Sequence, residues 1–278
     1  MTIKVLPQLR KQIWGSKRLG EMFGSEERIG EVWLLSGHPL FITETEEGID
    51  LNEDMERILG KVFPRFPILV KLISAEEWLS VQVHPNDEEA RLLEGEPWGK
   101  TEAWYFVEEG QIAIGEDPEK IKKALSTKNW NNALKKLKIL PETFVFLPAG
   151  TVHALGPSGF LIEIQQSSDV TYRVYDWDRG RELHIEKAFK VMKRRSFDDL
   201  LIKNFKEFEC EYFKVRKTKK ETLKGFCTIV VLEDGEVDSR EVRQFETYIV
   251  PKDEEAFLNT TSLVIELGNF FEKWGERP

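Results

Sequence analysis

Short apolar runs separated by turn-forming residues recur along most of the chain. The runs are rich in β-branched and aromatic residues and are bounded by glycine, proline or acidic residues, which is typical of strands. Their regular spacing predicts an antiparallel sandwich or barrel. Strands are expected at residues 68–73, 79–84, 103–107, 144–148, 160–166, 171–177, 226–233 and 246–251.

Helical patterns are fewer and lie between the groups of strands. Pro118, directly after Asp117, fits the first turn of a helix because proline lacks an amide hydrogen that would stay unpaired there. Asn86 or Asp87 fits the cap of another helix. Helices are therefore expected at residues 52–59, 86–94, 118–125, 129–137 and 183–194.

The composition shifts near residues 194–206, where the chain passes into a smaller β-rich tail. We therefore expect two domains, one at residues 1–200 and one at residues 201–278.

The tail also resembles a second copy of part of the first domain. WYFVEEG (104–110) aligns with IVVLEDG (229–235), and FVFLPAG (144–150) aligns with YIVPKDE (248–254) through the two prolines, Pro148 and Pro251. In this alignment Cys227 stands in the place of Glu102, and Ala256 stands in the place of His153. The hypothesis of an internal repeat therefore predicts that the second copy carries no metal site.

Charge and cysteine content narrow the function classes. The chain of 278 residues has 40 Lys and Arg against 49 Asp and Glu, and this net charge of −9 disfavours a dedicated nucleic-acid binder. Two cysteines cannot form a disulfide scaffold or a zinc site of four thiolates, so a reducing, cytoplasmic setting is expected. No window reaches the roughly 18 apolar residues of a membrane span. We expect no nucleic-acid or membrane partner.

Four polar residues in the strand-rich region are candidate metal ligands. Gln82 and His84, in LSVQVHP, are two positions apart and so project from the same face of a strand. Glu102 begins a later strand, and His153 follows a Pro-Ala-Gly turn. Two imidazoles and a carboxylate form a three-residue metal shell, with an amide oxygen as a fourth ligand. Nitrogen and oxygen donors without sulfur favour zinc, while iron, manganese and cobalt stay open.

The stretches around these residues resemble a known family. QVHP, GKTEAW, PAGTVHA and IEIQQSSDVTYRVYDW occur in order, as in the short bacterial type I phosphomannose isomerases of the cupin superfamily. IWGSKRLG and IGEVWLLSGHP extend the resemblance toward the N-terminus. It implies a mainly β cupin fold, a jelly-roll-like β-barrel with inserted helices, and a second, smaller cupin-like β domain without metal.

The resemblance also implies a set of site residues. The residues that match the family's zinc ligands, for one ion per chain, are Gln82, His84, Glu102 and His153. An arginine assigned to catalysis matches Arg173, a carboxylate discussed at the active site matches Glu163, and a lysine matches Lys100.

The implied reaction interconverts mannose 6-phosphate and fructose 6-phosphate through an enediol. Glu163 is the better candidate base, because the guanidinium of Arg173 stays protonated and suits stabilisation of the enediolate or binding of phosphate. Ser80 and Lys100 are further candidates for contacting phosphate, and Lys100 is also placed at the catalytic site. The oligomeric state stays open.

Other interpretations of the same residues remain. A ferrous-iron cupin oxygenase could use two histidines and a carboxylate, and a non-enzymatic sugar-phosphate-binding cupin could share the fold. Glu163 could be an exposed strand carboxylate, and Arg173 could pair with Asp169 or Asp176. His38 and His184 lack partners at ligand spacing and are expected to be structural.

Overall fold

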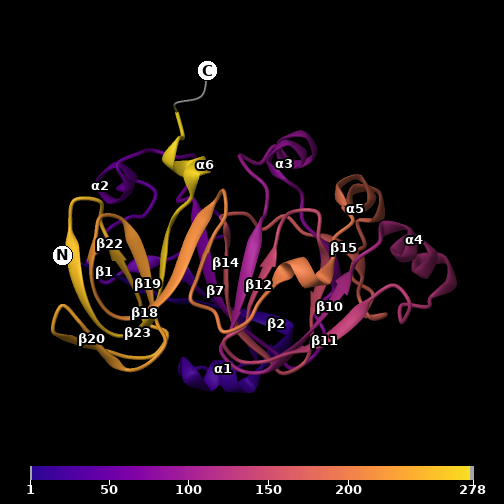
Figure 1. Cartoon of the computed structure of the whole chain (residues 1–278), viewed down its shortest axis with the longest axis horizontal. Helices are drawn as coiled ribbons and strands as arrows, with labels where there is room; N and C mark the ends of the chain where they lie inside the picture. The colour runs from indigo at the N-terminus through magenta and orange to yellow at the C-terminus, as the bar shows by residue number, and fades with distance from the viewer. Residues whose placement is uncertain (1, 276–278) are drawn as a thin grey trace. The chain divides into compact units, whose positions relative to one another are not determined.

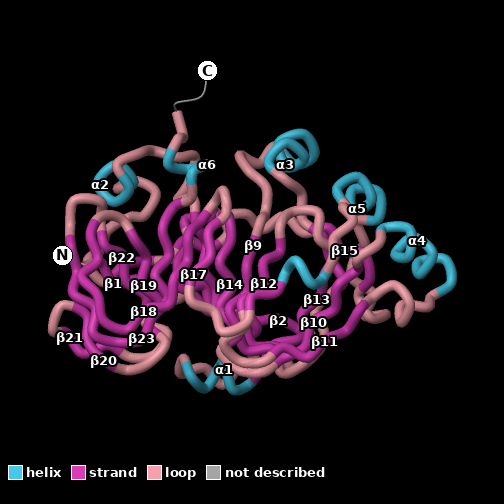
Figure 2. The backbone as a smooth tube through the Cα atoms, viewed as in Figure 1, coloured by secondary structure: helices cyan, strands magenta, loops and turns pink. Residues whose placement is uncertain are grey.

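Strands dominate the computed structural model of the chain, which describes residues 2–275 (Figure 1 and Figure 2). They form sheets of nine, seven, five and two strands. Antiparallel pairs run through these sheets. The expectation of a mainly β protein with helices between strands is confirmed.

The chain folds into two units, each assembled from segments that are distant in the sequence. Unit 2 contains Leu9–Val32 and Leu72–Asn204, and unit 1 contains the residues up to Gln8, Trp33–Lys71 and the residues from Phe205 onward. Segments of the two units therefore alternate along the sequence, whereas a single boundary at residue 200 was expected. Strand pairing accounts for the difference, because β1 (Ile3–Leu6) pairs with β22 (Thr247–Val250).

Two sheets build most of unit 2. In order of pairing, the five-stranded sheet contains β11 (Lys135–Ile139), β10 (Gly110–Gly115), β13 (Val152–Leu155), β8 (Val81–Val83) and β15 (Tyr172–Tyr175). The seven-stranded sheet contains β16 (Leu201–Ile202), β12 (Phe144–Leu147), β9 (Glu102–Phe106), β14 (Gly159–Gln166), β7 (Ile68–Ala75), β2 (Gln8–Ser16) and β3 (Ile29–Leu35).

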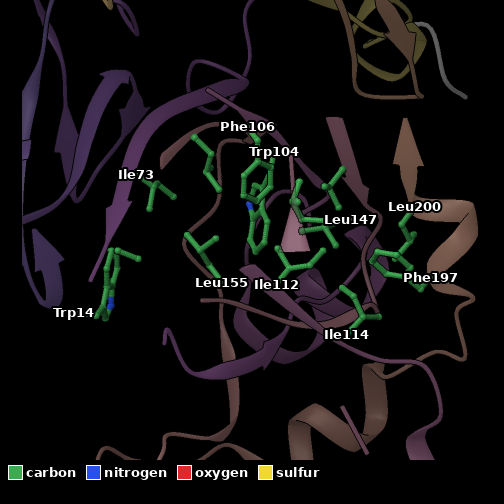
Figure 3. Packing of buried hydrophobic residues seen from close by; sticks show 14 residues of the cluster. Trp14, Ile73, Trp104, Phe106, Ile112, Ile114, Leu147, Leu155, Phe197 and Leu200 are labelled. Carbon is green, nitrogen blue, oxygen red and sulfur yellow. The ribbon is translucent and has the colours of Figure 1, made fainter. Parts of the chain in front are cut away.

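Apolar side chains from both of these sheets share one core (Figure 3). Trp104 and Phe106 of β9 pack there with Ile112 and Ile114 of β10 and with Leu155 of β13. Burial of this aromatic and aliphatic area stabilises the arrangement by roughly 25 cal/mol for each Å² removed from water. The two sheets therefore enclose an interior, as expected for a barrel.

Helices α4 (Pro118–Thr127) and α5 (Ile185–Val191) cover the outer face of the five-stranded sheet (Figure 1). Val81 and Val83 of β8 pack with apolar side chains of both helices. Gln82 lies between these valines and so projects to the opposite face, toward the interior. The alternation of apolar and polar residues in β8 thus directs a candidate ligand inward.

Two helices, α3 (Asp87–Glu94) and α4, begin at caps that the sequence predicts. Asn86 Oδ1 accepts a hydrogen bond from the amide of Glu89, whose carboxylate accepts one from the amide of Asn86, which is a capping box. Asp117 caps the helix that starts at Pro118. The helices of the structure are α1 (Lys17–Met22), α2 (Met55–Leu59), α3 (Asp87–Glu94), α4, α5 and α6 (Asn269–Glu272), with a 3-10 turn at Phe197–Leu200.

The helix expected at residues 129–137 is wrong. Lys128, with a φ of 55°, ends α4 in the left-handed region. Residues 131–133 form a turn, and β11 follows as the partner of β10. Trp130 stacks on Tyr175 with ring centroids 4.5 Å apart. The apolar spacing of this segment therefore resembles that of a helix for another reason. The ring of Trp130 packs before a turn, and β11 begins directly after that turn.

Unit 1 contains the largest sheet. Its strands are, in order of pairing, β17 (Glu207–Glu209), β18 (Phe213–Lys224), β23 (Glu255–Leu267), β19 (Cys227–Val231), β22, β1 and β6 (Glu44–Thr45), with β20 (Gly235–Val237) on β23 and β21 (Arg240–Val242) on β20. A separate pair is formed by β4 (Gly37–His38) and β5 (Phe41–Ile42).

The internal repeat is confirmed by strand register. Glu102 pairs with Leu147 in unit 2, and Cys227 pairs with Val250 in unit 1, as the alignment through Gly110, Gly235 and the two prolines requires. The following hairpins agree, because Gly110 pairs with Ile139 and Gly235 pairs with Val242. The two units therefore share a core strand pattern although few residues are identical.

Candidate metal and sugar-phosphate site

One row of side chains crosses the five-stranded sheet on its inner face. His153 of β13 is paired with Gln82 of β8, which is paired with Arg173 of β15. Residues in direct cross-strand register share a face of the sheet. The structure therefore brings together one imidazole, one amide and one guanidinium residue from segments up to 91 positions apart.

Glu102 enters the same interior from the other sheet and completes a metal-ligand cluster. Its Oε1 lies 3.1 Å from His153 Nε2, and its Oε2 lies 3.6 Å from His84 Nε2. All three side chains are buried, and the three candidate ligand atoms lie within 4.8 Å of one another. The predicted convergence of two imidazoles and one carboxylate is thus present in the structure.

Backbone carbonyls orient both imidazoles. The carbonyl oxygen of Val170 lies 2.8 Å from His84 Nδ1, and that of Thr151 lies 2.9 Å from His153 Nδ1. A carbonyl can only accept, so Nδ1 carries a hydrogen in each ring, and Nε2 is the nitrogen that faces Glu102. This arrangement is common for metal-binding histidines, whose second nitrogen donates to a carbonyl or carboxylate.

Charge and burial favour the protonation states of His84 and Glu102 that metal binding requires. Burial and the nearby positive charge of Lys100 hold the pKa of His84 well below its usual value, so the ring is neutral. For Glu102, burial alone would raise the pKa, but Lys100, His84 and His153 outweigh it and keep the pKa well below the usual range. Lys100 Nζ lies 3.0 Å from Glu102 Oε2.

The carboxylate oxygens of Glu102 indicate that this site can bind a further cation. Within residues 2–275, neither carboxylate oxygen has a hydrogen-bond partner of good geometry, although both are inaccessible to water. Lys100 offsets only part of the cost of burying this charge, so a further cation or donor would stabilise it. The donor set, two imidazole nitrogens and a carboxylate, suits a divalent transition metal. These residues therefore fit a metal ion.

Gln82 points at this cluster with its amide nitrogen. Nε2 lies 3.5 Å from Nε2 of both His84 and His153, while Oε1 accepts a hydrogen bond from Ser80 Oγ at 3.2 Å. Metal binding requires the oxygen, which a half turn of the amide would bring to the cluster. Ligation by Gln82 stays a prediction, and Ser80 contacts the amide in the present orientation.

Glu163 lies in the wall of the same interior. It is 4% exposed, and Trp104 Nε1 donates to its Oε2 at 2.8 Å. The Trp104 ring meets His153 edge to face, with centroids 5.3 Å apart. The alternative of an exposed strand carboxylate is therefore wrong, whereas the role of Glu163 as a base stays a prediction.

A buried aspartate organises the arginines that follow β15. Asp176, 3% exposed, accepts hydrogen bonds from Arg179 Nη2 at 2.8 Å and from Arg181 Nε at 2.9 Å. Arg173 Nη1 donates to the carbonyl of Glu182 at 2.8 Å. Burial, followed by the charge of Arg181, lowers the pKa of Arg173. Sequence reasoning missed this arginine cluster, although three arginines within nine residues are visible there.

The other two histidines make local contacts. His184 Nδ1 accepts a hydrogen bond from the amide of Arg173 at 3.1 Å, and His38 Nδ1 accepts one from the amide of Leu40 at 3.2 Å. Asp169 lies 3.8 Å from Arg10. These contacts agree with structural roles for the two histidines, and His184 helps to hold the backbone that carries Arg173.

The chain is similar in sequence to phosphomannose isomerases. A family model described as "Phosphomannose isomerase type I, catalytic domain" matches residues 3–114. The protein named "Probable mannose-6-phosphate isomerase GmuF" of Bacillus subtilis is 34% identical over 248 residues, which cover 77% of this chain and 78% of that protein. "Mannose-6-phosphate isomerase" of Streptococcus mutans is 36% identical over 208 residues, which cover 66% of each.

A solved structure agrees with these matches. The mannose 6-phosphate isomerase from Bacillus subtilis has a TM-score of 0.83 and 27% identity, and the match covers 95% of this chain and 98% of that chain. The resemblance drawn from the sequence motifs is thereby confirmed, together with the cupin fold. None of the helices within residues 2–275 combines the length and apolar character that a membrane crossing requires.

Proposed function

Because the chain belongs to the type I phosphomannose isomerase family, we propose that it interconverts mannose 6-phosphate and fructose 6-phosphate. The observation that carries this proposal is the buried cluster of His84, Glu102 and His153, whose ligand atoms lie within 4.8 Å of one another. Such a site suits aldose–ketose isomerisation, because negative charge must be stabilised on a sugar oxygen while a proton moves between neighbouring carbons.

The proposed metal is one zinc ion per chain. His84, Glu102 and His153 would hold it, with Gln82 Oε1 as a fourth ligand after the half turn of its amide. When bound, zinc supplies a Lewis acid that polarises the sugar carbonyl and lowers the energy of the enediolate. Other divalent metals share this donor preference, so metal identity is part of the test.

Glu163 is the proposed base. It removes the proton from C2 of the aldose while the hydroxyl proton moves from O2 to O1 by way of the enediol, and it returns the first proton to C1 to give the ketose. The indole hydrogen bond to Oε2 fixes the position of the carboxylate, and burial excludes competing water. This step leaves the number of atoms in the sugar unchanged, because the enzyme returns the proton that it takes.

Positively charged side chains are proposed to bind the phosphate and to stabilise the negative charge that develops on the sugar. Arg173 stays protonated and is proposed to stabilise the enediolate or bind phosphate. Lys100 is proposed to contact substrate oxygens from its place beside Glu102, and Ser80 is proposed to contact phosphate. In this proposal unit 2 is catalytic and unit 1 binds no metal. Location in the cytoplasm and the absence of nucleic-acid and membrane partners also stay predictions.

Metal removal and reloading test the proposal. The purified protein is stripped with a chelator, reloaded with single metals and assayed for interconversion of the two sugar phosphates. We expect no turnover without metal and restored turnover with zinc. Full turnover by the stripped protein would refute the metal mechanism, and binding of the sugar phosphate without turnover under every metal would support the non-enzymatic alternative. A requirement for oxygen would support the iron oxygenase.

A further inference from the structure

Gln165 occupies the position directly opposite Glu102. The two residues are paired in the register of β14 and β9, and both are fully buried. The next pair on the same face, Glu163 and Trp104, is joined by a hydrogen bond, and Trp104 contacts the ring of His153. The side chain of Gln165 therefore belongs to the face that looks into the site, one residue pair nearer to the candidate metal ligand than Glu163.

Two hydrogen bonds fix the amide of Gln165 in one orientation. Its Nε2 donates to the carbonyl oxygen of Gln166 at 2.8 Å and to that of Ser168 at 2.6 Å. Both amide hydrogens are then used, so exchange of the nitrogen and oxygen positions would break both bonds. The orientation of Gln165 is therefore set by the backbone, unlike that of Gln82, and its oxygen lies on the side of the amide away from these two carbonyls.

That oxygen is an acceptor without a donor. Within residues 2–275, Oε1 of Gln165 has no hydrogen-bond partner and is inaccessible to water, as are both oxygens of Glu102. A metal ion would satisfy Glu102, but a neutral amide oxygen held across the strand pair is suited to accept from a hydroxyl group. Leaving such an acceptor unpaired lowers the equilibrium constant for folding or for binding by a factor of about 10 to 100.

We propose that Gln165 Oε1 accepts a hydrogen bond from a hydroxyl group of the open-chain sugar, which makes Gln165 a substrate-binding residue. This inference rests on the proposed function, because it requires a polyhydroxylated substrate at the metal cluster. The acceptor demands a hydroxyl at one position of the sugar chain. Gln165 therefore selects for substrates that carry a hydroxyl there.

Binding of open-chain analogues tests this contact. Mannitol 6-phosphate, which has no carbonyl and does not react, and derivatives that each lack one hydroxyl are titrated calorimetrically into zinc-saturated protein. One derivative should bind the wild-type protein about 10- to 100-fold more weakly than the parent. In Gln165→Met that difference should shrink to about twofold or less, because the acceptor is gone. Gln111→Met is the matched control, since Gln111 is exposed, and it should behave as wild type.

The outcomes are separable. If every derivative loses the same affinity in wild type and in Gln165→Met, the contact is refuted while wild-type turnover still supports the isomerase. If the wild-type protein turns over no mannose 6-phosphate, the function on which the contact rests fails. Gln165→Glu keeps an acceptor and should keep the discrimination. If neither variant folds, the wild-type series decides. The proposal is overturned when every derivative binds the wild-type protein less than tenfold more weakly than mannitol 6-phosphate does.

Discussion

Replacing Glu102 by glutamine tests how the site balances its buried charges before a metal binds. Lys100 Nζ is 3.0 Å from Glu102 Oε2, and the two side chains are 4% and 0% exposed. At an effective dielectric constant of about 20, opposite charges at that distance attract by roughly 5 kcal/mol. Glu102→Gln keeps the shape but leaves Lys100 buried without its partner, which costs about 3–5 kcal/mol. We expect the free energy of unfolding of the metal-free protein to fall by that amount.

Urea unfolding in the presence of chelator at pH 7 measures this loss. Glu109→Gln is the matched control, because Glu109 Oε2 lies 2.8 Å from Lys138 Nζ with both side chains more than half exposed. Surface ion pairs contribute about 1 kcal/mol or less, so this variant should unfold almost as the wild type does. The two variants make the same chemical change, one at a buried ion pair and one at an exposed ion pair.

A double variant separates loss of the ion pair from general damage. Adding Lys100→Met to Glu102→Gln removes the uncompensated charge, so it should recover at least about 2 kcal/mol of the lost stability. Equal unfolding free energies for Glu102→Gln and the Glu109→Gln control would refute the reasoning. So would a double variant less stable than Glu102→Gln alone.

Three further changes probe the metal, the reaction and an arginine anchor. His153→Ala should weaken zinc binding by more than about 100-fold in a chelator competition, because loss of a ligand exceeds the effect of losing a ligand's partner. Arg173→Ala should retain zinc by metal analysis and lower kcat about 100- to 1000-fold; an unchanged kcat would rule out its catalytic role. For Asp176, burial raises the pKa, but Arg181 and Arg179 outweigh it and hold the pKa below its usual value. Its charge therefore stabilises the fold above about pH 4, and this contribution is lost as the pH falls through the folded-state pKa. Asp176→Asn should lower Tm at pH 7 and flatten its decline in acid; a parallel decline in both proteins would contradict this.

Local pattern predicted the elements of the fold better than their pairing. The apolar runs at 144–148 and 160–166 become strands because β-branched and aromatic side chains pack on a half-buried sheet. Pairing of β1 with β22 depends on contacts between residues more than 240 positions apart, which no local pattern reports. The interleaved units follow from that pairing, so a boundary drawn from composition could not include them.

The site shows the same division between local and distant information. The two-residue spacing of Gln82 and His84 predicted that they share a face, and the motifs indicated their partners. Gln165 was missed although it is two positions from Glu163, where strand alternation places it on the same face. Asp176 was considered only as a partner of Arg173, because its burial is visible only after the loop beyond β15 folds back on itself.

The second copy of the repeat shows what the polar site replaces. The shared strand registers identify the residues of unit 1 that stand in the places of Glu102, His153 and Glu163. They are, in that order, Cys227, Ala256 and Val264. All three belong to one buried apolar cluster. A dry core therefore suffices to hold this strand pattern together. In unit 2 the same positions bury the Glu102 carboxylate. Its pairing with Lys100 at 3.0 Å compensates only part of the desolvation cost, because its oxygens have no hydrogen-bond partner within the described residues, and the remainder destabilises the metal-free fold. Binding of a cation offsets that destabilisation, so metal affinity and the stability of unit 2 should rise and fall together.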